Sequence, residues 1–377
     1  AGRVPRRRHV DGAGCALEFE IDDVRLVLFL DGPLVHECAL GGVIGQRALT
    51  VAVALACGSF AAQAADLTAQ EKGLIEAAKK EGSVTIIHPL FSDRTAQRMS
   101  AAFKKRYGLG DGFKFNSLRK GTGSTVAQVR QEIKAGKFTV DMIMVHSPSF
   151  FAAAAKRDAF LKLDSGYWEK DVAAGAAAAG QYANYPYVVT PLAYSFQPVW
   201  NSACPGMADF KVTSYADVLD PKYKGKTIVS DITKSFTYTN SVISLRESGY
   251  DVNGMWKKLK ATDPIVEFRT EPKMQMLISC QRPIDMWNLS GRVYQNVKKK
   301  PDLASKIKQG TYKEGHVMLG NQLAVLKGAR NPNAAKLLAE FLLSKEGTDI
   351  AVEGEAIYSF RANYTPPAAA KPYLMDL

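Results

Sequence analysis

Short apolar segments alternate with helical segments along most of this chain, and that alternation constrains the fold more than any other feature of the sequence. Strand-like runs lie at residues 83–88, 113–118 and 139–145, and each is followed by a segment of helical character. The same order resumes at residues 226–230 and 283–287. Strands separated by helices of about 10–15 residues are typical of βαβ units, in which the strands run parallel. The sequence therefore predicts an α/β fold.

Several helix starts are marked by capping residues. Thr68 and Glu71 have the spacing of a capping box, in which each side chain accepts a backbone hydrogen bond of the other residue. Ser92 is expected to cap the next helix, and either Thr122 or Ser124 is expected to open the one after it. Glycines follow these three segments and predict where the helices end.

Two stretches separate the alternating elements and are expected to be extended. Residues 185–200 are rich in Val, Tyr, Pro and Phe, and residues 316–326 have a similar character. We predict that the first connects two lobes and that the second carries the chain back. Residues 333–344 then form a helix, because apolar residues recur there every three to four positions.

Length and composition exclude several classes of protein. The 377 residues correspond to two domains of about 100–200 residues each. With 46% hydrophobic and 23% charged residues, the chain is neither mainly disordered nor fibrous. No apolar run in the folded part reaches the length of about 18 residues that a transmembrane helix needs. The formal net charge of +12 predicts an anionic ligand or partner, or a charge that serves solubility.

The first 64 residues are predicted to be absent from the mature protein. Arg47 precedes the apolar run 48–56, and an Ala-x-Ala sequence ends at Ala64. A basic residue, a short apolar run and such a site form a secretory signal, so we expect cleavage after Ala64. Lipoprotein processing at Cys57 is the alternative. Residues 1–40 are interpreted as an upstream extension without helical or strand periodicity.

Only Cys204 and Cys280, of five cysteines, follow the predicted cleavage site. An even pair in an oxidising compartment can form a disulfide, which here would close a loop of about 75 residues. Two separate buried thiols are the alternative. Neither the spacing nor a nearby histidine pattern indicates a metal site, so we predict no metal and no cofactor.

Candidate binding residues lie in the loops that follow the predicted strands. Ligands of open parallel sheets bind at the carboxyl ends of strands, and each such loop here leads into a helix N-terminus that favours anions. The loop 119–125 is the clearest case, because Gly121 and Gly123 allow close backbone approach beside basic and hydroxyl side chains. Capping of their own helices is the alternative for the serines. The candidate set is Ser92, Lys120, Gly121, Thr122, Ser124, Ser147, Tyr194, Thr233, Ser235, Asn288 and Arg292.

Two longer motifs resemble a known family. They are SYADVLDPKYKGK at residues 214–226 and NPNAAKLLAEFLLSKEG at residues 331–347, with weaker support at 131–141 and 359–361. Together with the order of the elements they resemble the type II periplasmic substrate-binding proteins of ABC importers. The similar branch holds binders of ferric iron, thiamine, polyamines and phosphonates.

The resemblance implies two α/β lobes, each a mostly parallel sheet flanked by helices, joined by two hinge strands. The expected lobes are residues 65–190 with 318–360, and residues 191–317 with 361–377. A solute would be held between the lobes and delivered to a membrane permease and its ATPase. The resemblance also implies a periplasmic protein that is a monomer. We predict no nucleic-acid binding, because the secretory signal and the absence of a helix-turn-helix before residue 65 argue against a DNA-linked sensor, and we predict no enzyme activity for the reason given below.

One departure from the family pattern bears on the class of ligand. Ferric binders of this branch usually carry adjacent tyrosines, and no Tyr-Tyr pair occurs after residue 64. The loops offer hydroxyls, amides and cations instead, which favours a small organic anion or oxo-anion such as a carboxylate, phosphonate or phosphate ester. Ferric iron or an iron chelate is the alternative ligand. An enzyme on the same fold is the alternative of another class, although no nucleophile–base pair is visible in the sequence.

Overall fold

The structure is a computed structural model that describes residues 7–10, 14–21, 24–30 and 67–375. The chain divides into two compact units, residues 1–66 and 67–377, and each is described by itself. The predicted signal sequence and its cleavage site lie outside the described residues. Within these residues, no helix is both long and apolar enough to cross a membrane.

The first unit contains a small antiparallel sheet that the sequence analysis missed. Its strands are β1 (Arg7–Val10), β2 (Gly14–Ile21) and β3 (Val24–Leu30), in the order β1-β2-β3. The prediction that residues 1–40 lack periodicity was wrong, because residues 15–21 alternate apolar residues with Ala and Glu. A period of two over seven residues is a strand pattern.

The second unit carries the α/β alternation that the sequence predicts. Its strands are β4 (Ser83–His88), β5 (Lys114–Arg119), β6 (Met142–Val145), β7 (Val189–Asn201), β8 (Thr227–Val229), β9 (Ile265–Val266), β10 (Ile284–Leu289), β11 (Ile307–Gln309), β12 (Met318–Val325) and β13 (Tyr358–Ser359). Its α-helices are α3 (Ala69–Glu81), α4 (Asp93–Tyr107), α5 (Thr122–Ala135), α6 (Pro148–Ala155), α7 (Ala173–Ala178), α8 (Tyr215–Val218), α9 (Phe236–Glu247), α10 (Val252–Ala261), α11 (Thr270–Ile278), α12 (Ser290–Lys299), α13 (Leu303–Lys306), α14 (Pro332–Leu343) and α15 (Lys345–Glu355). Short non-α helices lie at Trp168–Val172, Pro221–Tyr223 and Lys371–Tyr373.

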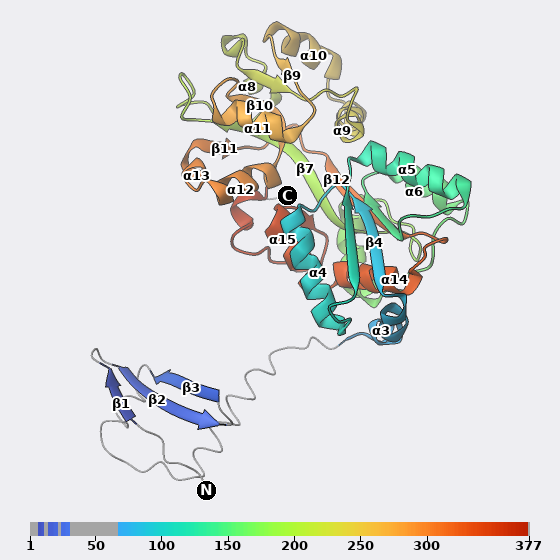
Figure 1. Ribbon diagram of the computed structural model, residues 1–377. Coiled ribbons are helices and arrows are strands. Elements are labelled where there is room, and N and C mark those ends of the chain that lie inside the picture. Colours follow the sequence, from blue (N-terminus) through green and yellow to red (C-terminus); the bar gives the residue numbers. More distant parts are fainter. Residues whose placement is uncertain (1–6, 11–13, 22–23, 31–66, 376–377) are drawn as a thin grey trace. The chain divides into compact units, whose positions relative to one another are not determined.

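The long strand β7 joins two groups of strands. The strand order is β5-β4-β6-β12-β7-β10-β8-β9, with β11 and β13 also paired to β7. Residues 189–195 of β7 pair with β12, whereas residues 196–201 pair with β10 and β11. We call β4, β5, β6, β12, β13 and the first part of β7 the first lobe. The second lobe is β8 to β11 with the rest of β7 (Figure 1).

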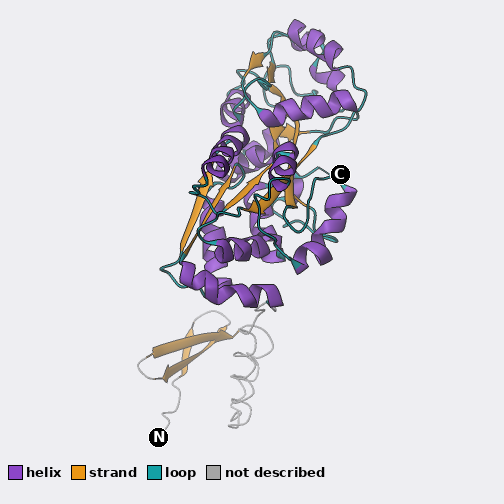
Figure 2. Ribbon diagram, turned by 90° about the vertical axis from the view of Figure 1, so that its right-hand side faces the viewer, coloured by secondary structure: helices purple, strands orange, loops and turns teal. Residues whose placement is uncertain are grey.

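Each lobe contains a parallel core of three strands. The β4–β5 and β4–β6 pairs are parallel in the first lobe, and the β10–β8 and β8–β9 pairs are parallel in the second. All pairs that involve β7 or β12 are antiparallel. The two predicted connectors are therefore the strands that reverse direction, and helices flank the strands in both lobes (Figure 2).

Most predicted helix starts agree with the structure. The Thr68 and Glu71 capping box is present at α3, and the Ser92 hydroxyl accepts from the Thr95 backbone at α4. Helix α5 begins at Thr122, one of the two residues expected to open it, but its N-cap is Gly121 and no side chain caps it. Both Thr122 and Ser124, which were expected to open this helix, lie within its first turn.

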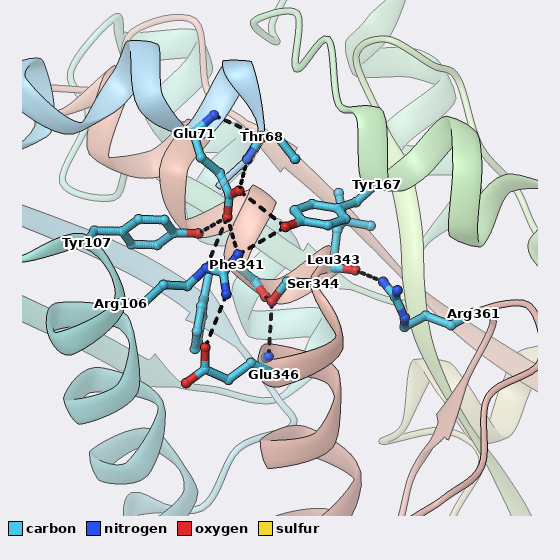
Figure 3. Close-up of polar contacts among 11 residues, drawn as sticks. Thr68, Glu71, Arg106, Tyr107, Tyr167, Phe341, Leu343, Ser344, Glu346 and Arg361 are labelled. Carbon is cyan, nitrogen blue, oxygen red and sulfur yellow. Dashed lines mark hydrogen bonds and ion pairs between the residues drawn. The ribbon is translucent and has the colours of Figure 1, made fainter. Parts of the chain in front are cut away.

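A buried polar cluster around Glu71 ties α3 to its neighbours (Figure 3). Its carboxylate accepts from the Tyr107 hydroxyl at 2.6 Å, from Arg106 Nη2 at 2.9 Å and from the Tyr167 hydroxyl at 3.2 Å. The Glu71 side chain is fully buried, and a buried carboxylate is stable only with such partners. Arg106 reaches on to Glu346 of α15 at 3.3 Å, so the capping-box residue also fixes the packing of α3, α4 and α15.

A disulfide joins two parts of the second lobe. Cys204 follows β7, Cys280 follows α11, and their Cα atoms lie 5.5 Å apart. Nearby, the fully buried Lys273 of α11 contacts Asp285 of β10 at 3.0 Å. Both links hold α11 against the sheet, and the N-terminus of α11 faces the cavity described next.

Candidate functional site

A cavity of about 590 Å³ lies where the two lobes face each other. From the first lobe it is lined by Pro89, Leu90, Arg119, Lys120, Gly121, Thr122, Gly123, Ser124, Tyr194, Glu355 and Ile357. From the second lobe it is lined by Phe196, Lys234, Ser235, Phe236, Thr237, Tyr238, Phe268, Arg269, Thr270, Glu271, Leu289, Ser290, Gly291, Arg292 and Gln295. A volume of this size suits a small organic molecule.

Four helices begin at this cavity without a capping side chain. They are α5, α9, α11 and α12, and their N-cap residues are Gly121, Ser235, Arg269 and Leu289. The first backbone N–H groups of a helix have no partner inside the helix, and the helix dipole adds partial positive charge there. The open ends therefore direct hydrogen-bond donors and positive potential at one space.

Other long helices of the described part contrast with these four. Capping side chains of Thr68, Ser92, Asp251 and Ser344 close α3, α4, α10 and α15. Glu81 accepts the first backbone N–H groups of α14. The uncapped starts thus gather at the cavity. Among the other long helices of the described residues, the N-cap side chains of α6 and α14 make no capping bond, but Glu81 takes that role for α14.

Cations outnumber anions around the cavity. The cationic side chains that line it are Arg119, Lys120, Lys234, Arg269 and Arg292, and the acidic ones are Glu271 and Glu355. Some of these charges are already paired locally, because Lys234 contacts Asp231 at 3.3 Å and Arg269 contacts Glu267 at 3.2 Å. Arg119 of the first lobe and Arg292 of the second both line the cavity, so they are the best candidates to bind an anion there.

Arg292 is held rigidly at the start of α12. Its Nε donates to Thr270 Oγ1 at 2.8 Å, its Nη1 to Gln295 Oε1 at 2.6 Å, and its Nη2 lies 3.0 Å from Glu271 Oε1. The side chain is only 12% exposed. Burial lowers the pKa of Arg292 below its ordinary value, and the charge of Arg119 lowers it further, while Glu271 opposes both.

Glu271 is the side chain that bridges the two arginines. Its Oε1 lies 3.0 Å from Arg292 Nη2 in the second lobe and 4.0 Å from Arg119 Nη2 in the first. Burial favours the neutral carboxyl, but the charge of Arg292, the backbone N–H of Glu271, the Thr270 hydroxyl and the charge of Arg119 together outweigh it, so the pKa of Glu271 is lowered. An ionised carboxylate is therefore stable between the two guanidinium groups.

Aromatic side chains form the apolar part of the wall. Tyr194 and Phe196 lie next to each other on β7 with ring centroids 5.8 Å apart, and Phe196 stacks on Tyr238 at 4.0 Å. Burial raises the pKa values of the Tyr194 and Tyr238 hydroxyls. Both phenols are therefore neutral near pH 7, and they present rings and hydroxyls rather than phenolate oxygens.

The structure brings seven of the predicted site residues together and leaves four elsewhere. Lys120, Gly121, Thr122, Ser124, Tyr194, Ser235 and Arg292 line the cavity. Lys120 is exposed and donates to Gln128 Oε1 at 2.7 Å. The other four are Ser92, Ser147, Thr233 and Asn288.

Each of these four residues is either buried or bonded to another group of the protein. Ser92 caps α4 and donates from both its backbone and its hydroxyl to Glu355, so it reaches the cavity only through that residue. Ser147 is buried at the start of α6, and Thr233 bonds to Asp231. Asn288 is buried and donates to the Asp285 carboxylate at 2.8 Å.

Two parts of the cavity wall escaped the sequence analysis. One is the start of α11 with Arg269 and Glu271, which follows β9, a strand of only two residues. A strand this short carries no readable periodicity. The other is Glu355 at the end of α15. Its Oε2 accepts a hydrogen bond from Gln295 Nε2 of α12 at 2.6 Å, and both residues line the cavity.

The three histidines that follow residue 66, His88, His146 and His316, bond to other groups of the fold. His88 is buried between Ser117 Oγ and the Phe91 backbone, and burial, aided by the Arg119 charge, lowers its pKa to about 3. His146 contacts the Gly320 carbonyl, and His316 accepts from the Tyr312 backbone. No group of three His, Cys, Asp or Glu in the described part of the chain could hold a metal ion.

Comparison with known proteins places the chain in a family. Residues 98–374 match the family model described as bacterial extracellular solute-binding protein. No curated protein matches the sequence significantly.

Solved structures share the fold at low sequence identity. Iron-bound HitA from Pseudomonas aeruginosa is similar with 16% identity and a TM-score of 0.61, over 76% of this chain and 89% of that one. AfuA from Actinobacillus pleuropneumoniae, with fructose-6-phosphate bound, is similar with 16% identity and a TM-score of 0.61, over 76% and 88%. A substrate-binding protein of an ABC transporter from Agrobacterium tumefaciens follows with 15% identity and a TM-score of 0.60, over 75% and 81%. These structures support the two-lobed α/β fold.

Proposed function

This chain belongs to the bacterial extracellular solute-binding protein family, and from that premise we propose that it captures a small organic anion between its two lobes. The anion is a carboxylate, a phosphonate or a phosphate ester. The protein then delivers it to the permease and ATPase of an ABC importer. Delivery requires a location outside the cytoplasmic membrane, which agrees with the predicted signal sequence and cleavage after Ala64.

The observation that carries the anionic ligand is the meeting of four uncapped helix N-termini at one cavity. Backbone N–H groups at such ends bind phosphates and carboxylates without needing a cation. Here Arg119 and Arg292 add guanidinium groups, which match the paired oxygens of a carboxylate or phosphonate. A neutral solute could accept hydrogen bonds from these groups but would gain little from their positive charge.

Contacts from both lobes give the binding a mechanical consequence. The start of α5 and Arg119 belong to the first lobe, whereas α9, α11, α12 and Arg292 belong to the second. A solute that contacts both sets stabilises the closed arrangement by the difference between its affinities for the closed and open forms. The permease can then distinguish loaded from empty protein by shape.

Ferric iron is the weaker candidate on the same observations. Hard Fe(III) prefers several anionic oxygen ligands. The cavity offers Tyr194 and Tyr238 as buried neutral phenols, and its two carboxylates, Glu271 and Glu355, are fewer than the anionic oxygens that such an ion prefers. HitA binds iron, but at 16% identity it is similar in fold alone.

A thermal-shift screen tests the proposal. The panel contains phosphonates, sugar phosphates, aliphatic and aromatic carboxylates, polyamines, thiamine and ferric citrate. A ligand at about 100 times its Kd adds about 2.7 kcal/mol to the free energy of unfolding, which shifts Tm by several degrees.

We expect a shift with one class of anion, and its loss in Arg292→Gln. The matched control is Arg98→Gln, because Arg98 forms an exposed ion pair with Glu353 and does not line the cavity. A shift with ferric citrate alone would replace the anion by iron. A shift with polyamines or thiamine alone would show that the cavity takes cations, and the anionic proposal would be wrong.

A further inference from the structure

We propose that the Glu271 carboxylate occupies the position of the solute's anionic group, and that the solute must displace it to bind. The inference rests on the proposed function and adds a residue that sets the specificity of the site. It follows from the position of Glu271 between two arginines of opposite lobes.

The carboxylate makes the contacts that an anionic solute would make. Its Oε1 lies 3.0 Å from Arg292 Nη2 and 4.0 Å from Arg119 Nη2, and it sits in the first turn of α11. All three residues line the cavity. A carboxylate, phosphonate or phosphate group of the solute offers the same anionic oxygen acceptors as this side chain.

Glu271 is also free to leave. Its side chain is 60% exposed, whereas that of Arg292 is 12% exposed and fixed by Thr270 and Gln295. The remaining bond to Glu271 comes from its neighbour Thr270, whose hydroxyl lies 3.1 Å from Oε2. Rotation of Glu271 into solvent therefore leaves the arginine frame in place.

When Glu271 leaves, the positive charges of Arg119 and Arg292 are no longer balanced by an anion. The charges of Arg119 and Arg292 already disfavour each other, and Glu271 lies between them. Without it, two guanidinium groups face each other in a cavity that also receives four helix N-termini. An anionic solute restores the balance, but a neutral solute does not, so the exchange selects for anions.

Because every anionic solute must displace the Glu271 carboxylate, this competition lowers the affinity of the site for all anions. Ion pairs with one exposed partner are worth about 1 kcal/mol, and about 1.4 kcal/mol corresponds to a tenfold change in affinity. Removing the internal carboxylate should therefore tighten the binding of a simple anion about fivefold.

The test is calorimetric titration of methylphosphonate into the purified full-length chain and into Glu271→Gln and Glu271→Ala. We expect both variants to bind methylphosphonate about fivefold more tightly than the unaltered protein. The matched control is Glu353→Gln, because Glu353 is an exposed carboxylate that pairs with Arg98 and does not line the cavity. That control should bind as the unaltered protein does.

Each outcome decides the matter. If the unaltered protein does not bind methylphosphonate, the panel's best anion replaces it as the titrant. Equal or weaker binding of the titrant in both Glu271 variants overturns the inference and leaves the proposed function standing. Weaker binding would mean that Glu271 contacts the solute favourably. If neither the unaltered protein nor any variant binds methylphosphonate or any anion of the panel, the proposed function fails and this inference fails with it.

Discussion

Glu340 carries the sharpest stability prediction in the structure. It lies on α14, is 1% exposed, and neither of its carboxylate oxygens has a hydrogen-bond partner within the described residues. Burial raises the pKa of Glu340 from 4.5 to about 7, while Ser165 opposes the rise and the nearby charge of Glu71 adds to it. The carboxyl group is therefore neutral in the folded protein under acidic conditions.

The sign and size of the effect follow from the two pKa values. Because the folded-state pKa is raised, the stability that neutral Glu340 contributes is complete below pH 4.5 and is lost as the pH rises through about 7. The difference of about 2.5 pKa units corresponds to about 3 kcal/mol at 1.36 kcal/mol per unit. Glu340→Gln keeps the shape and removes the titration. Its free energy of unfolding, relative to the unaltered protein, should rise by about 3 kcal/mol between pH 4.5 and pH 8.

Guanidinium unfolding followed by tryptophan fluorescence at pH 4.5 and pH 8 measures this difference. The control is Glu346→Gln, an exposed carboxylate that pairs with Arg106. The control should change stability by no more than about 1 kcal/mol, because ion pairs with an exposed partner contribute little. If Glu340→Gln and the unaltered protein show the same pH dependence, the reasoning about Glu340 is refuted.

Three other predictions concern the site and the elements that support it. The double variant Lys120→Ala with Arg292→Ala should weaken the panel's best anion at least about tenfold in calorimetry while the unfolding midpoint changes little, and unchanged affinity would show that the anion site is misplaced. Asp285→Asn should lower the free energy of unfolding by about 3–5 kcal/mol, because it leaves the fully buried Lys273 without its anion. Adding Lys273→Met should recover most of that loss, and no recovery would contradict the pairing. Gly291→Ala should destabilise the protein by about 1–3 kcal/mol and weaken anion binding, since an added Cβ would lie 2.2 Å from a carbonyl oxygen of α15, and a neutral effect in both assays would contradict the tight contact of α12 with α15.

The sequence predicts the scaffold well where local signals and periodicity agree. The strand at 83–88 and the helix from Asp93 to about Tyr107 are predicted with the bounds that the structure shows, because an apolar run, the capping Ser92 and the terminal Gly108 all point the same way. Strand β9 escaped because two residues carry no pattern.

The site was only partly predictable because capping and ligand binding compete for the same residues. Ser92 was chosen as a ligand donor, but its hydroxyl caps α4 and bonds to Glu355. The informative signal is the opposite one: Gly121, Arg269 and Leu289 stand at N-cap positions although none is a strong capping side chain. Helix starts without a capping residue, after strands at one sheet edge, mark open N-termini.

Long-range pairings could not be predicted from the sequence. The contact of Glu271 with Arg119 joins residues 152 positions apart on different lobes, and that of Glu355 with Ser92 joins residues 263 positions apart. No local periodicity reports such contacts. They depend on how β7 and β12 bring the lobes together.

A crystal structure of the protein with the anion that gives the largest thermal shift tests the central claim most directly. The account predicts that the anionic group lies between Arg119 and Arg292, within about 3 Å of backbone N–H groups at the starts of α5 and α12. Glu271 should have turned into solvent. An anion bound outside this cavity, or bound within it without contact to any of the four helix N-termini, would contradict the account.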